Sequence, residues 1–243
     1  MKIFKTFESF LQEGVNDPGI LKAFFMAGGP GSGKSYVAGE LFSLPKDSSA
    51  SVSYDLGLKL VNSDAAFELL LKKANIDMAQ LMDIKDKDPV AWQNAMQIRD
   101  KAKKITKGTQ KMYIQGRLGM VIDGTGKNYK KIKGQVEELR SLGYDCYMVF
   151  VNTSKEIALD RNNARPRKLP EDMVTKMWQE VQDNLGKFQR LFKAKRFEIV
   201  DNSVYGDTTP TDLVGKEIRK FMGQPVSNSI GRQWIKNKKN IRK

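Results

Sequence analysis

The sequence predicts an α/β fold, a three-layer sandwich in which helices cover both faces of a parallel sheet of about five strands. One observation behind this prediction is that short apolar runs, which suit buried strands, alternate along the chain with longer segments of helical spacing. Another is that the first apolar run stops in the glycine-rich stretch "GGPGSGKS", which fits the Walker A pattern Gly28-x-x-x-x-Gly33-Lys34-Ser35. A phosphate-binding loop between a strand and a helix is typical of P-loop NTPases, so we expect that fold class.

The flanks of this loop support its interpretation as a phosphate site. Residues 23–27 form an apolar segment that suits a buried parallel strand, and residues 35–42 can continue as a helix. In that geometry backbone N–H groups face an anion at a helix N-terminus, and glycine allows the tight turn. We expect Lys34 to reach the β- and γ-phosphates of ATP and Ser35 to offer its hydroxyl to Mg²⁺; the alternative is a glycine-rich turn without a ligand. The residues of the loop expected to bind the nucleotide are Gly28, Gly29, Pro30, Gly31, Ser32, Gly33, Lys34 and Ser35.

Four further apolar runs predict the rest of the sheet. After a segment of loop composition at 43–55, "LKLVNSD" predicts a second strand that ends at Asp64. "LGMVIDGTG" predicts a third strand that again stops in small residues, and "YDCYMVFV" and "RFEIVDN" predict the fourth and fifth. The strands after the first are therefore expected within residues 58–64, 118–126, 144–151 and 196–202.

Segments of helical spacing separate these runs. From Ala65 to about Gly116 the pattern is helical, and Asp88-Pro89 supplies an N-cap followed by a proline at the first helical position. We therefore expect a large helical insertion between the second and third strands. Further helices are expected at 129–142, 155–163, 170–193 and 211–222. Together these elements predict one P-loop domain over residues 20–224.

The two ends of the chain are expected to lie outside this domain. The N-terminal segment 1–19 is predicted to be amphipathic, with a short helix closed by the turn "NDPG" at 16–19. The C-terminal segment 225–243 is expected to be either an appendage of low order or a basic helix, because it carries six basic residues and no acid from Arg232 onward. The apolar residues at helical spacing in the N-terminal segment are Ile3, Phe4, Phe7, Phe10 and Leu11.

Composition excludes several kinds of chemistry. The chain has no histidine, which excludes histidine triads, His-ligated zinc and imidazole acid–base catalysis, so carboxylates must carry any proton transfer. Its single cysteine, Cys146, lies in an apolar run, which excludes a disulfide framework and predicts a buried thiol in a reducing cytoplasm. No apolar run approaches the roughly 20 residues of a membrane span. The net charge of +14 favours polyanionic partners.

Carboxylates follow three of the predicted strands. Asp64, Asp123 and Asp201 end the second, third and fifth strands, and the carboxyl ends of parallel strands converge on one crevice. A phosphoryl transferase needs one carboxylate near Mg²⁺ and another to deprotonate the acceptor hydroxyl. We expect Asp123 beside Mg²⁺ and Asp64 as the base. For any one of the three, a helix cap or a turn residue is the alternative.

Arginines gather after the fourth strand. "RNNARPRK" at 161–168 places Arg161, Arg165 and Arg167 where they can bridge phosphates and stabilise the charge of a transition state. We expect this segment to act as an arginine-rich lid. The alternative is a solvated basic loop before the next helix.

The order of these motifs resembles that of P-loop kinases of the zeta-toxin and polynucleotide-kinase type. "GGPGSGKS", "VNSD", "VIDGTG", "RNNARPRK" and "IVDNS" follow one another at the approximate spacing of that family between about 22 and 222. The resemblance implies that Asp64 is the base toward a substrate hydroxyl and that Asp123-Gly124-Thr125 line the substrate and metal side. It also implies that Arg161 and either Arg165 or Arg167 are the lid arginines, and that Asn202-Ser203 contact the adenine.

Two departures from the family pattern concern the acceptor and the lid. The common continuation N-x-D-x-x-R is absent, since Asp64 is followed by Ala65-Ala66-Phe67, so a substrate-binding arginine is missing there. The frequent Gly-Arg pair of the lid is also absent, which leaves Arg165 and Arg167 competing for one role.

A second resemblance concerns the N-terminus. "MKIFKTFESFLQEG" is similar to leaders of proteins from large tailed phages, with "LQE" before Gly14 resembling a prohead-protease site. This resemblance implies a removable leader at 1–13, action in the cytoplasm of a bacterial host and packaging in the virion. An ordinary amphipathic helix is the favoured interpretation of the segment.

Two functions from different classes follow. The first is an ATP- and Mg²⁺-dependent kinase that transfers the γ-phosphate to a hydroxyl of a nucleic-acid end, a nucleotide or a sugar nucleotide. The second is a nucleic-acid-binding or virion-associated protein whose P-loop only binds or slowly hydrolyses ATP. The basic run "RDKAKKITKGTQK" at 99–111 and the basic tail would favour a nucleic acid if they flank the crevice; solvated charge is the alternative. The oligomeric state is left open.

Overall fold

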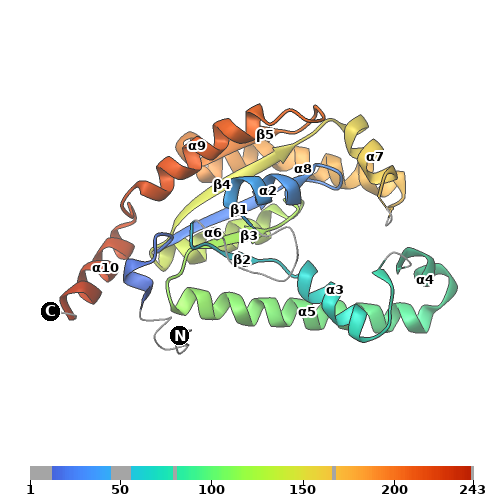
Figure 1. Ribbon diagram of the computed structural model, residues 1–243, viewed down its shortest axis with the longest axis horizontal. Helices are drawn as coiled ribbons and strands as arrows, with labels where there is room; N and C mark the ends of the chain where they lie inside the picture. The colour runs from blue at the N-terminus through green and yellow to red at the C-terminus, as the bar shows by residue number, and fades with distance from the viewer. Residues whose placement is uncertain (1–12, 45–55, 79–80, 166–167, 242–243) are drawn as a thin grey trace, which may run out of the picture.

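The computed structural model describes residues 13–44, 56–78, 81–165 and 168–241. Its centre is one sheet of five parallel strands in the order β2-β3-β1-β4-β5, which confirms the predicted α/β class (Figure 1). The central strand β1 is buried along its whole length, as a continuous apolar run predicts. The strands are β1 (Lys22–Ala27), β2 (Lys59–Val61), β3 (Met120–Asp123), β4 (Asp145–Asn152) and β5 (Phe197–Asp201).

Helices connect successive strands, close to the predicted bounds. The predicted insertion between β2 and β3 consists of the helices α3, α4 and α5. The α-helices are α2 (Lys34–Phe42), α3 (Asp64–Lys73), α4 (Leu81–Lys87), α5 (Pro89–Gln115), α6 (Tyr129–Ser141), α7 (Lys155–Asn163), α8 (Glu171–Phe192), α9 (Thr209–Gly223) and α10 (Ser229–Ile241), with short 3₁₀ turns η1 (Glu13–Asn16) and η3 (Ala194–Arg196).

Alternate side chains of β1 build the two halves of the core. Phe25 points toward the layer of α6 and α8 and stacks on Phe192, with ring centroids 5.6 Å apart. Phe24 points toward the layer of α2 and α9, where its ring lies 4.9 Å from that of Phe42 and 5.4 Å from that of Phe221. The molecule is therefore the three-layer sandwich that the sequence predicts, and the sheet is held rigidly enough to position the loops at its edge.

The helical insertion has a small apolar cluster of its own. Phe67 and Leu71 of α3 pack there against Ala95 and Ala102 of α5. The side chain of Asp88 accepts hydrogen bonds from the backbone N–H groups of residues 90 and 91 at 3.1 and 2.9 Å, which confirms the predicted N-cap of α5. With 27 residues, α5 is about 40 Å long. It runs along one side of the molecule and carries α3 and α4 at one end (Figure 1).

The structure describes the C-terminal end of the chain up to Ile241, whereas at the N-terminal end it describes residues from Glu13 onward. The predicted amphipathic residues up to Leu11 lie outside the described residues. Of the two alternatives for the C-terminal segment, the structure shows a helix, α10, and not an appendage of low order. Trp234 and Ile235 pack against the core layer of α6 and α8, and Gly231 lies against the backbone of Gly143. No helix in the described part of the chain is long and apolar enough to cross a membrane.

A buried polar junction fixes the start of α10. Asp145, at the amino end of β4, accepts hydrogen bonds from Ser227 N at 2.7 Å, from Ser227 Oγ at 2.8 Å and from Asn228 N at 3.1 Å. Its carboxylate also lies 3.5 Å from Lys22 Nζ and 3.6 Å from an Arg196 nitrogen. Because Lys22 opens β1, this junction places α10 at the amino edge of the sheet, opposite the phosphate-binding loop.

The single cysteine is buried as expected. Cys146 is only 1% exposed in β4, and burial raises the pKa of its thiol to about 12. At neutral pH the thiol is therefore protonated, which fits a structural role.

Candidate active site

The phosphate-binding loop connects β1 with α2, as predicted. Gly31 and Gly33 have φ angles of +74° and +77°, in the left-handed region that favours glycine. A Cβ atom at Gly31 would collide with the carbonyl oxygen of Ala158, and one at Gly33 would collide with Asn202 Nδ2. Both glycines are therefore required by the backbone conformation and by the close approach of α7 and the loop after β5. The N-terminus of α2 opens directly from this loop, which suits an anion.

Three elements meet at a polar network beside the loop. Lys34 Nζ forms an ion pair with Asp123 Oδ1, and both side chains are largely shielded from solvent. Asn62 Nδ2 donates to Asp123 Oδ2 at 2.9 Å, while Asn62 Oδ1 accepts from Asp64 N at 2.8 Å. The structure thus links Lys34, Asp123 and the backbone of Asp64, which come from three separate sequence motifs.

Asp64 occupies a different element from the predicted one. The strand β2 ends at Val61, and Asp64 is the first residue of α3 rather than the last residue of a strand. The turn closed by the Asn62 side chain directs the backbone from the strand into the helix. The exposed carboxylate of Asp64 therefore lies in the first turn of a helix.

The loop after β5 supports the other side of the phosphate-binding loop. Asn202 Nδ2 donates to Ser32 O at 2.8 Å, and Arg161 Nη1 of α7 donates to Gly31 O at 3.4 Å. The guanidinium of Arg161 also lies over the ring of Tyr205, 4.7 Å from its centroid. Two of the predicted residues, Arg161 and Asn202, therefore contact the loop directly.

The remaining predicted residues differ in whether they contact the phosphate-binding loop. Arg165 is exposed in the turn after α7, and Arg167 lies outside the described residues. Thr125 accepts a hydrogen bond from Gly28 N through its carbonyl oxygen at 3.1 Å. Asp201 accepts from Ser203 N at 3.1 Å and from Ser203 Oγ at 2.6 Å, so of the three carboxylates it is the turn residue.

Two contacts at the site come from α8, a helix to which sequence reasoning gave no role. Trp178 Nε1 donates to Thr153 O at 2.9 Å, and its Cα lies 3.6 Å from the position of a Cβ at Gly29. Gln182 Nε2 donates to Asn152 Oδ1 at 2.8 Å. These side chains anchor the end of β4 next to the phosphate-binding loop. Their spacing along α8 is that of any packed helix, so nothing in the sequence marks them.

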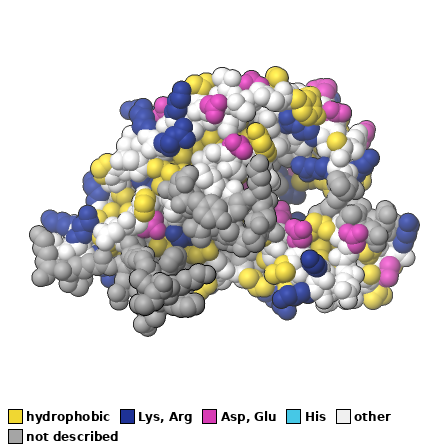
Figure 2. Space-filling view, viewed as in Figure 1, with side chains coloured by type: hydrophobic (Ala, Val, Ile, Leu, Met, Phe, Trp, Pro, Cys, Tyr) yellow, Lys and Arg dark blue, Asp and Glu magenta, His cyan; other side chains and the backbone are white. Residues whose placement is uncertain are grey.

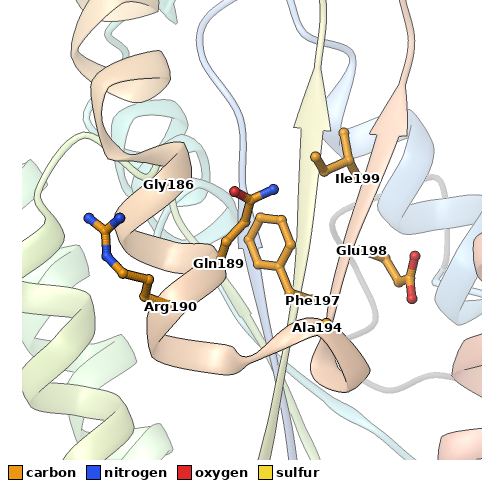
Figure 3. Close-up of a pocket in the computed structure, with 7 residues that line it drawn as sticks. All are labelled: Gly186, Gln189, Arg190, Ala194, Phe197, Glu198 and Ile199. Carbon is orange, nitrogen blue, oxygen red and sulfur yellow. The ribbon is translucent and has the colours of Figure 1, made fainter.

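The site lies where the surface is hollowed. Figure 2 shows a hollow between the part of the molecule that carries α7 and the part that carries α3 and α4, next to the carboxyl edge of the sheet. A separate pocket of about 580 Å³ lies between the end of α8 and the edge strand β5 (Figure 3). None of the predicted site residues lines that pocket, so it is not part of the phosphate site.

A comparison with models of protein families identifies the family of this chain. Residues 78–207, more than half of it, match the model of the zeta toxins. The chain belongs to the zeta toxin family. The matched range includes Asp123, Arg161 and Asn202, whereas the phosphate-binding loop and Asp64 precede it. The sequence and fold together make this zeta toxin relative a P-loop kinase.

Two solved structures are similar to this zeta toxin relative. One comes from the PezAT chromosomal toxin–antitoxin system of Streptococcus pneumoniae, with a TM-score of 0.51, 15% identity and 99% coverage of both chains. A putative kinase from Chloroflexus aurantiacus has a TM-score of 0.48 and 10% identity, covering 84% of this chain and 97% of its own. At these identities the likeness to the PezAT structure shows the fold. None of the curated proteins matches the sequence.

Proposed function

We propose that the protein transfers the γ-phosphate of ATP to a hydroxyl of a nucleic-acid end, a nucleotide or a sugar nucleotide. The observation that carries this proposal is the network of Lys34, Asp123 and Asn62, which connects the phosphate-binding loop to the first residue of α3. It puts a carboxylate, Asp64, on the β2 side of the loop, while Arg161 lies on the β4 side. A nucleotide bound by the loop would have a base on one flank and a cation on the other.

The oxygen donors of the site fit Mg²⁺. Ser35, in the first turn of α2, and Asp123, at the end of β3, would hold the ion together with phosphate oxygens. Among the described residues no group of three or more His, Cys, Asp or Glu side chains gathers to hold a metal. That fits an ion bound mainly through the nucleotide and water, as is usual for Mg²⁺. When bound, Mg²⁺ neutralises charge on the β- and γ-phosphates.

Each of the site's side chains has a separate role in the proposed reaction. Asp64 accepts the proton of the acceptor hydroxyl, whose oxygen forms a bond to the γ-phosphorus. The bond from the γ-phosphorus to the bridging oxygen breaks, and its electron pair leaves with ADP. Lys34 donates to the β- and γ-phosphates once they replace Asp123 as its partner, and Arg161 and Arg165 add positive charge to the site. Asn202 supports the loop from the side on which the base of the nucleotide would lie.

The distribution of positive charge narrows the surface available to a polynucleotide acceptor. The basic tail forms α10 at the amino edge of the sheet, whereas the phosphate-binding loop lies at the carboxyl edge (Figure 1). The described residues of the tail, up to Ile241, therefore lie away from the crevice. The basic run of α5 lies closer to the site, because Thr106 Oγ1 of that helix is 3.5 Å from Asn62 O. A nucleic-acid acceptor would be held along α5.

Transfer of labelled phosphate tests the proposal. The protein is incubated with γ-labelled ATP, Mg²⁺ and separate pools of RNA, DNA, nucleotides and nucleotide sugars, and we expect label in one pool. Asp64→Asn should abolish this label while ATP still binds, and Asp123→Asn should also weaken the dependence on Mg²⁺. Glu68→Gln, an exposed carboxylate one turn further along α3, is the matched control and should behave as wild type. Release of free phosphate without any labelled pool would instead favour a protein that only hydrolyses ATP.

A further inference from the structure

An exposed tyrosine lies beside the phosphate-binding loop. Tyr205 follows β5, and its side chain is 59% exposed. Its ring lies under the guanidinium of Arg161, with 4.7 Å between Cζ and the ring centroid. Its hydroxyl donates to Asp160 Oδ2 at 2.9 Å. Asp160 and Arg161 are neighbours in the last turn of α7, so the tyrosine contacts both side chains at once.

These contacts decide where the guanidinium of Arg161 points. An arginine side chain has several rotatable bonds, and an exposed guanidinium samples many positions unless its neighbours restrict it. Here one face of the group rests on the aromatic ring, which attracts a cation. Its Nη1 atom reaches Gly31 O at 3.4 Å and lies 3.5 Å from the position of a Cβ at Gly33. The guanidinium is thereby kept against the loop that would hold the phosphates.

The guanidinium of Arg161 also approaches the loop from the side opposite to Asp64, where the acceptor would bind. Arg161 reaches the loop from the end of α7, which follows β4, while Asp64 begins α3, which follows β2. In the sheet these two strands lie on opposite sides of β1. A cation fixed in this position can contact a nucleotide in the loop but is turned away from the hydroxyl that Asp64 would deprotonate.

We propose that Tyr205 is a positioning residue that holds Arg161 on the nucleotide side of the phosphate-binding loop. This inference rests on the proposed function for the identity of the ligand, ATP. In it Tyr205 acts through Arg161: the ring holds the guanidinium, and the hydrogen bond from the hydroxyl to Asp160 makes only a minor contribution to the placement of the ring.

Equilibrium binding of a fluorescent ATP analogue, with Mg²⁺, tests the inference without any turnover. Tyr205→Ala should weaken binding about fivefold, the size of an exposed cation–π contact, whereas Tyr205→Phe keeps the ring and should stay within about twofold of wild type. In the Arg161→Ala background, Tyr205→Ala should have no further effect, since the group that it positions is gone. Val204→Ala, at the neighbouring side chain that is 62% exposed, is the matched control and should bind as wild type.

Two results would overturn the inference. One is a loss of affinity from Tyr205→Ala that is undiminished in the Arg161→Ala background, because the tyrosine would then act on the nucleotide directly or on the fold. The other is a Tyr205→Phe protein as weak as Tyr205→Ala, since the ring would then contribute nothing.

Steady-state kinetics separate the inference from the proposed function. The KM for ATP should rise in Tyr205→Ala while the KM for the acceptor stays unchanged; a rise confined to the acceptor KM would place Arg161 on the wrong side and contradict the inference. If the wild-type protein binds the analogue but phosphorylates no acceptor, the proposed function fails, whereas the binding cycle still decides the role of Tyr205.

Discussion

Asn62 uses both ends of one amide group to connect the candidate base with the candidate metal ligand. Its nitrogen donates to Asp123 and its oxygen accepts from the backbone of Asp64, at 2.9 and 2.8 Å. Lys34, Asp64 and Asp123 were each predictable, because each belongs to a short local pattern. The role of Asn62 depends on contacts between segments 61 residues apart, and that of Tyr205 on a contact between the loop after β5 and helix α7, so neither can be read from spacing.

Replacing the single residue Lys34 tests whether the phosphate-binding loop is the active site. Lys34→Ala removes a charge-assisted contact that strengthens as charge develops on the transferred group, so phosphate transfer should fall by about three orders of magnitude. The protein should stay folded by circular dichroism, because the loop glycines and α2 keep their contacts. Lys133→Ala, at an exposed lysine of α6, serves as the control. Normal transfer by a folded Lys34→Ala protein would place the active site elsewhere.

At the scale of elements, the connection between α7 and α8 is closed by one buried side chain. Asn162 is 1% exposed, its Nδ2 donates to Leu169 O at 2.8 Å and its Oδ1 accepts from Leu169 N at 3.1 Å. This reciprocal pair holds together the two ends of the segment that carries Arg165. The helices on either side were predicted to within a residue from their periodicity, whereas the pair was not, because an asparagine near the end of a helix is usually a simple turn residue.

Asn162→Ala should therefore destabilise the protein. The change leaves the N–H and carbonyl groups of Leu169 without their partner, which costs about 1–3 kcal/mol. Thermal or urea unfolding measures the loss. Asn163→Ala, at the exposed neighbour whose side chain donates to Glu171, is the matched control and should cost less than about 0.5 kcal/mol. Equal stability of the two variants would show that the buried pair does not hold the segment.

Across the whole molecule, the two edges of the sheet have different tasks. The carboxyl edge gathers the candidate active site, and the amino edge fixes α10 through the junction at Asp145. Burial disfavours the carboxylate of Asp145, but hydrogen bonds from Ser227 and the charges of Arg196 and Lys22 outweigh it and lower its pKa. Burial lowers the pKa of Lys22, and the positive charge of Arg196 adds to this effect, whereas the carboxylate of Asp145 opposes it. The sequence left the tail open between a basic helix and an appendage of low order, because the buried contacts that dock it involve residues more than 80 positions away.

The pH dependence of stability tests this junction. A lowered carboxyl pKa in the folded state means that Asp145 stabilises the fold fully above its unfolded pKa near 3.8, and that this contribution is lost as the pH falls below that value. Asp145→Asn should cost about 3 kcal/mol at neutral pH and flatten the loss of stability below pH 4. Glu137→Gln, which removes the exposed ion pair with Lys133, should cost less than about 0.5 kcal/mol. If the Asp145→Asn protein lost stability at low pH in the same way as the wild type, Asp145 would not be the group that makes the stability depend on pH.

The ion pair between Lys34 and Asp123 balances the positive charge that Lys34 brings to the phosphate-binding loop. An anion that enters alone must take Lys34 from its carboxylate and leave that carboxylate in a shielded place without a counter-charge. A nucleotide that arrives with its divalent cation replaces both partners at once. Binding of the nucleotide and of the cation should therefore be thermodynamically linked, each raising the affinity for the other by the same factor. We therefore expect the loop to bind free phosphate more weakly than a nucleotide with its cation, although no residue acts against phosphate directly.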